Sequence, residues 1–173
     1  MTEELPDRAV RAFETHDAYE RSDPAWFAVT TTRFDGRVTA EETDDWALTY
    51  TLEVRAPMLS SATEDDVGDA VEEGWFETYE LRLEDAPMAV REDVDLADQR
   101  VFEEAGDAVA VFEFEWGNAD RAPDIAKAMA EFVEGTYVEG VVPGYEYTQP
   151  VSDLLSRARQ SSGDESGRGP MPL

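Results

Sequence analysis

Residues 46–55 read WALTYTLEVR, and this stretch decides the fold class. Every second side chain from Trp46 to Val54 is large and apolar, whereas the residues between them are mostly threonine, glutamate or arginine. Successive side chains of a β-strand point to opposite faces, so this alternation predicts a strand with one face in the core and the other mostly in water. Such a strand is typical of an antiparallel sheet that is solvated on one side.

Further strands are predicted on both sides of this stretch. Residues 26–34 are rich in aromatic and β-branched side chains, and Asp35-Gly36 is a hairpin signal that leads into residues 37–43. Downstream, residues 99–104 and 108–116 flank a glycine-containing turn and form a second hairpin. We therefore expect an antiparallel sheet of about five strands, a three-strand meander plus a hairpin.

Helical periodicity fills most of the remaining chain. Helices are predicted from about Pro6 until Asp23-Pro24 ends the first of them, after Thr63, over residues 75–85, from about Asp120 to Thr136, and after Pro150. Gly74 is expected to break or bend the second of these, and residues 75–85 also fit a strand. The fold class is thus α+β, with the helices packed on one face of the sheet. Residues 1–159 are expected to form a single domain, and residues 160–173, rich in serine, glycine and proline, a disordered tail.

The charge balance is strongly acidic. Aspartate and glutamate number 41 against 14 basic residues, the formal net charge is -27, and Lys127 is the one lysine. At about 1 M salt the screening length falls to roughly 3 Å, which removes most of the repulsion within such a surface. The composition resembles that of haloarchaeal proteins from cells that accumulate potassium chloride. It predicts a halophilic, cytoplasmic protein that holds K+ or Na+ loosely on its surface.

Several classes of function are excluded or disfavoured by the composition. The absence of cysteine excludes disulfides and thiolate chemistry, and neither a GxGxxG nor a GxxxxGK[ST] pattern occurs. Residues 1–7 are acidic and lack the features of a signal peptide, and no apolar run is long enough to span a bilayer. Such an acidic chain also lacks the basic surface that nucleic acids require. We expect no cofactor, no nucleic-acid partner and no membrane association.

Two resemblances rest on these patterns. The element order over about residues 6–138 is helix, three strands, helix, two strands, helix, and it is similar to the fold of type III secretion chaperones and YbjN-like proteins. That resemblance implies binding of partner-protein segments, often by a homodimer. Separately, the acidic and aromatic sequences of residues 74–77 and 112–116 resemble those of small uncharacterised haloarchaeal proteins with a domain of unknown function. Neither resemblance supplies a catalytic residue.

Four side chains are candidates for contact with a partner or ligand. His16 is the one histidine, but it lies on the apolar stripe of the first helix, where packing is the favoured interpretation. Tyr137, Tyr145 and Tyr147 belong to a glycine- and proline-containing segment, residues 135–147, that is expected to be a loop or a short strand. Aromatic residues there are not explained by periodicity, so they could form a binding surface or belong to the core.

Other chemical groups have simpler interpretations. The carboxylate clusters at residues 41–45 and 64–69 lack the spacing of a calcium loop and indicate solvated surface. The four tryptophans are expected to pack in the core. No catalytic or metal-binding residue is predicted. The leading hypothesis is a non-enzymatic protein-binding or adaptor module, and the alternatives are a small-molecule or cation-binding protein and a carboxylate-dependent hydrolase.

Overall fold

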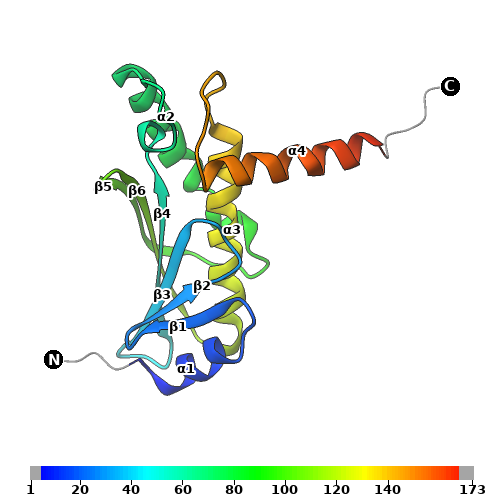
Figure 1. Ribbon diagram of the computed structural model, residues 1–173. Coiled ribbons are helices and arrows are strands. Elements are labelled where there is room, and N and C mark those ends of the chain that lie inside the picture. The colour runs from blue at the N-terminus through cyan, green and yellow to red at the C-terminus, as the bar shows by residue number, and fades with distance from the viewer. Residues whose placement is uncertain (1–4, 168–173) are drawn as a thin grey trace.

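A six-stranded antiparallel sheet forms the centre of the molecule (Figure 1). The computed structural model describes residues 5–167, with side chains up to residue 160. The strand order is β1-β2-β3-β4-β6-β5, which confirms the predicted α+β class and an antiparallel sheet of about the expected size. The strands are β1 (Tyr19–Asp23), β2 (Trp26–Val29), β3 (Asp35–Glu42), β4 (Leu48–Pro57), β5 (Leu96–Glu104) and β6 (Asp107–Trp116).

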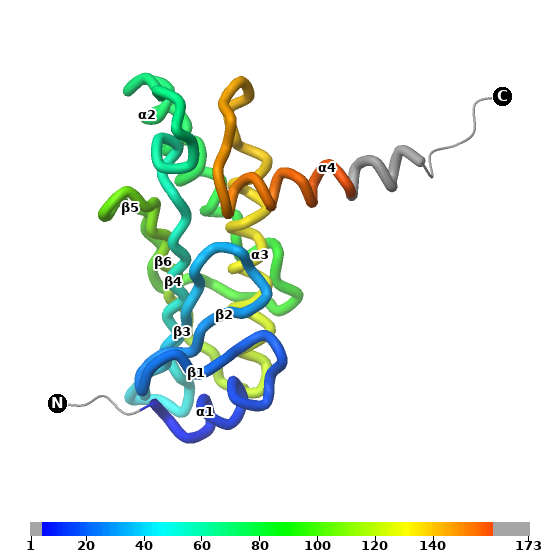
Figure 2. The backbone as a smooth tube through the Cα atoms, viewed as in Figure 1, coloured from blue at the N-terminus to red at the C-terminus, as the bar shows by residue number. Residues whose placement is uncertain are grey.

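The helices lie on one side of this sheet, as predicted (Figure 1). They are α1 (Asp7–Glu14), α2 (Asp69–Leu83), α3 (Ala122–Gly140) and α4 (Val151–Gly167), with short 3-10 turns at Leu59–Ser61, Ala86–Ala89 and Ala119–Arg121. α3 runs along the sheet, whereas α1 and α2 lie at opposite ends of the molecule (Figure 2). α4 points away from the body after its first turns (Figure 1).

The core lies between α3 and the inner face of the sheet. Alternate residues of β4, from Leu48 to Ala56, are buried, and they pair across the sheet with buried residues of β6 such as Phe112 and Phe114. The Phe13 ring of α1 stacks on Phe27 at a centroid distance of 5.0 Å and closes one end of the core. The apolar face predicted for β4 is therefore the face against which the helices pack.

The opposite face of the sheet carries charged side chains held in ion pairs. The guanidinium of Arg37 lies 3.9 Å from the Trp26 ring centroid and pairs with Glu53 at 3.3 Å. Arg55 pairs with Glu104 at 2.9 Å and with Asp107 at 3.5 Å. These half-exposed ion pairs keep the outer face hydrated, as the alternation of residues 46–55 predicted.

The first hairpin differs from its prediction. Asp35-Gly36 lies inside β3, and the chain turns at residues 30–34, where the Glu134 carboxylate accepts hydrogen bonds from the backbone N–H groups of Arg33 and Phe34. A Cβ at Gly36 would meet the Val29 side chain at 3.2 Å, so this glycine permits close strand packing. β1 was also missed, because the first helix was expected to continue to Asp23-Pro24, whereas α1 ends at Glu14 and the sequence YERSD of β1 has no apolar alternation.

Three further expectations are corrected. Gly74 does not break α2, which is continuous and confirms that residues 75–83 are helical. Trp46 is 69% exposed, since β4 begins only at Leu48. α4 runs to Gly167, beyond residue 160 where the disordered tail was predicted, and no proline interrupts it before Pro170. Residues 168–173 of that predicted tail lie outside the described residues.

Candidate functional site

An open hollow of about 710 Å³ lies between residues 141–147 and the first turns of α4. We call it the tyrosine groove. One wall is formed by Val141, Val142, Pro143, Tyr145, Glu146 and Tyr147, and the other by Ser152, Leu155, Ala158 and Arg159 of α4. Most of these side chains are apolar, which sets the groove apart from the carboxylate-rich surface around it.

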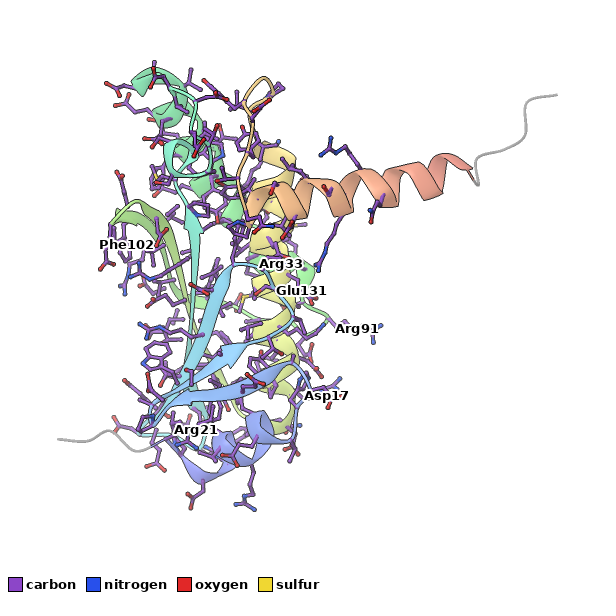
Figure 3. The ribbon with its side chains drawn as sticks, viewed as in Figure 1. Asp17, Arg21, Arg33, Arg91, Phe102 and Glu131 are labelled. Atoms are coloured by element: carbon purple, nitrogen blue, oxygen red, sulfur yellow. The ribbon has the colours of Figure 1, made fainter. Side chains whose placement is uncertain are left out.

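The position of α4 leaves the groove open. Val151 and Leu154 are buried and fix the first turn of the helix to the body, and Asp153 pairs with Arg33 at 3.6 Å. Figure 3 shows Arg33 close to the start of α4. Beyond this turn the helix leaves the body, so Leu155 and Ala158 remain half-buried along the groove. The sequence signal for this wall is the apolar stripe Val151, Leu154, Leu155 and Ala158, which extends beyond the one turn that is docked on the body.

The opposite wall is held in place by hydrogen bonds to residues 62–65. The Thr63 hydroxyl donates to the Glu146 carbonyl at 2.6 Å, and the Glu146 N–H donates to the Asp65 carboxylate at 2.8 Å. The Thr148 N–H donates to the Ala62 carbonyl at 2.8 Å. A segment fixed in this way loses little conformational entropy when it binds a ligand.

Tyr145 and Tyr147 both line the groove, but their environments differ. Their rings meet edge to face at a centroid distance of 6.3 Å, and each side chain is half-buried. The Tyr147 hydroxyl donates to the Val142 carbonyl, and burial raises the pKa of Tyr147 above its ordinary value. Tyr147 therefore helps to hold the wall, which leaves Tyr145 as the contact candidate of the two.

Tyr137 belongs to the core, so its candidacy as a contact residue is corrected. Its side chain is fully buried, and its hydroxyl donates to the Pro57 carbonyl at 2.8 Å. The ring meets Phe34 and Trp75 edge to face, at 4.9 and 5.4 Å. The physical reason is that α3 continues to Gly140, which places Tyr137 one turn after buried Val133 on the same face.

His16 connects α1 to α3. Its Nδ1 accepts a hydrogen bond from the Ala18 N–H at 3.1 Å, so Nε2 carries the proton and donates to the Asp124 carboxylate at 2.7 Å. Both ring nitrogens are thus engaged in the fold. General-base work would require one of these bonds to break, so the geometry favours the packing interpretation.

The carboxylates of the described residues do not gather into a metal site. Within the part of the chain that the structure describes, no group of three or more histidine, aspartate or glutamate side chains is placed to hold a metal ion. In the cluster at residues 64–69, the Asp65 carboxylate accepts a hydrogen bond from the Glu146 N–H. Its neighbours Glu64 and Asp66 are exposed to solvent. The tyrosine groove therefore remains the candidate site.

Comparison with known proteins places the chain in a family. A family model described as a family of unknown function (DUF5813) matches residues 14–157, which includes the sheet, α3 and the start of α4. The chain belongs to the DUF5813 family. No curated protein and no solved structure matches it. Membership of DUF5813 confirms the predicted relation to a domain of unknown function. None of the described helices combines the length and apolar character needed to cross a membrane.

Proposed function

We propose that this chain is a non-enzymatic protein-binding module that holds an apolar segment of a partner protein in the tyrosine groove. The observation that carries the proposal is the groove itself, where Tyr145 and Leu155 line opposite walls of an open hollow. Apolar hollows on an otherwise charged surface are typical of interaction sites, and tyrosine is enriched among the residues that dominate binding energy. The wall that carries Tyr145 is already ordered, which favours affinity.

The proposal includes the setting in which the module works, the potassium-rich cytoplasm of a salt-accumulating cell. Among the described side chains, the buried polar residues are Thr63 and Thr136, so every described aspartate and glutamate keeps contact with solvent. Carboxylates at such positions hold water and loosely bound K+ or Na+, and they keep the surface hydrated where salt strengthens apolar association. In that setting an apolar groove binds more strongly, and attraction between surface charges acts only between groups in direct contact.

Affinity purification from a cell extract in about 2 M potassium chloride tests the proposal. We expect a co-purifying protein whose affinity falls about thirtyfold in Tyr145→Ser and in Leu155→Ser, because each loses about 2 kcal/mol of apolar contact. Met88→Ser is the matched control, since Met88 is 82% exposed and lies away from the groove. Equal recovery from all three variants would show that the groove is not the binding surface.

Sedimentation of the purified chain identifies the partner if it is a second copy. A dimer that dissociates in Tyr145→Ser and Leu155→Ser, but not in Met88→Ser, would make the module a homodimer. Thermal melting of each variant checks that the fold is intact. A large loss of melting temperature in Tyr145→Ser would assign this residue to the core instead.

A further inference from the structure

β5 is an edge strand whose outer side has no strand partner among the described residues. It pairs with β6 alone, in antiparallel register from Asp98 opposite Glu113 to Glu104 opposite Asp107. In an antiparallel pair, the backbone N–H and C=O groups of every second residue point away from the neighbouring strand. Such an edge is a template for a further strand.

A groove separates this edge from α2. It consists of two hollows of about 570 and 350 Å³ that share Glu77. Consecutive residues 99–103 of β5 line the groove. Because successive side chains of a strand point to opposite faces, a groove lined by five residues in sequence follows the edge of the strand and not one of its faces. We call it the edge groove.

The α2 side of the edge groove carries a row of carboxylates. Glu73, Glu77, Glu80 and Glu84 recur at the spacing of one helix face, and all four line the groove. Within residues 5–160, none of them takes part in an ion pair, whereas Arg100 on the β5 side is paired with Asp98 at 3.1 Å. The groove thus has a surplus of negative charge beside the free edge.

Apolar side chains lie among these carboxylates. Phe102 is 37% exposed and Leu81 is 67% exposed, and Phe76 is partly buried and lines the same groove. Figure 3 shows Phe102 on the side of the β5–β6 hairpin that faces away from α3. An occupant of the groove therefore meets apolar contacts, carboxylates and unpaired backbone groups along one line.

We propose that the edge groove binds an extended basic segment of a partner protein, which adds a strand to β5. Backbone hydrogen bonds to the edge and apolar contacts with Phe102 and Leu81 give affinity, and the glutamate row selects arginine or lysine side chains. A second copy of the chain is disfavoured, because pairing of two β5 edges would bring two glutamate rows together. This surface is separate from the tyrosine groove and does not depend on the function proposed there.

A fluorescein-labelled peptide of about ten residues, alternating arginine and valine, is the probe for strand addition. Binding is measured by fluorescence anisotropy in about 2 M potassium chloride, where attraction by net charge alone is screened. Two further peptides carry N-methyl groups on the valine amides only or on the arginine amides only. In a strand these amides point to opposite sides, so we expect one methylated peptide to bind at least about tenfold more weakly and the other to bind nearly as well as the parent.

Matched variants then locate the site. The double variant Glu77→Gln/Glu80→Gln and the single variant Phe102→Ser should each weaken binding of the parent peptide about tenfold. Glu64→Gln/Asp66→Asn changes the net charge equally on exposed residues outside the groove and should leave the affinity unchanged. Circular dichroism checks that each variant is folded. Equal affinities of the two methylated peptides, equal effects of the two double variants, or loss of binding in Tyr145→Ser would each overturn the proposal.

Discussion

At the scale of single residues, two buried tyrosine hydroxyls make opposite contributions to stability. The Tyr137 hydroxyl donates to the Pro57 carbonyl, whereas the Tyr50 hydroxyl has no hydrogen-bond partner among the described residues. We expect Tyr137→Phe to lower the free energy of unfolding by about 1 kcal/mol, since it leaves a partly buried carbonyl without its donor. Tyr50→Phe should leave the free energy unchanged or raise it by about 1 kcal/mol. Denaturant unfolding at neutral pH measures both changes.

Alkaline unfolding checks the burial of Tyr50. Burial raises the pKa of Tyr50 to about 12, above an ordinary value of about 10 in the unfolded chain. A folded-state pKa that is raised means that stability is fully present below pH 10 and is lost as the pH rises toward 12. The Tyr50→Phe variant should lose less stability over this range than the wild type. An unchanged pH dependence would contradict a deeply buried Tyr50.

At the scale of elements, glycines in α2 and in the β5–β6 turn should respond oppositely to alanine. Gly74 lies in the exposed interior of α2, and a Cβ there would meet nothing within 4 Å. Gly74→Ala should raise the free energy of unfolding by about 0.5–1 kcal/mol, because alanine loses less backbone entropy in a helix. Gly106 has a φ of +84°, so Gly106→Ala should destabilise by about 1 kcal/mol or more. Thermal unfolding compares the two, and a destabilised Gly74→Ala would indicate a contact at that position.

At the scale of the whole molecule, the acidic surface makes stability depend on salt. The net charge is -27, and the described aspartates and glutamates lie on exposed and half-exposed side chains that repel one another at low ionic strength. We expect the melting temperature to fall on dilution from about 2 M to about 0.1 M potassium chloride, as the screening length grows from under 3 Å to about 10 Å. Circular dichroism during heating measures this shift. An unchanged melting temperature at low salt would refute the proposed halophilic setting.

The sequence by itself determined the features that depend on local periodicity. Alternation over residues 46–55 and 108–116 identified the central strands and their core faces, and helical spacing identified α2 and most of α3. The irregular segment before Pro150 drew attention to Tyr145 and Tyr147, which line the tyrosine groove. Solvent exposure of the acids also followed from composition, because an unpaired charge is too costly to bury.

Only the tertiary structure decided which distant segments meet. The sequence of β1 has no apolar alternation and gave no strand signal, and the burial of Tyr137 follows from one further turn of α3 against Pro57 and Trp75. The second wall of the tyrosine groove depends on the direction in which α4 leaves the body, and the edge groove depends on α2 lying beside β5. Contacts between segments far apart in the chain are set by the packing of whole elements, which no local pattern encodes.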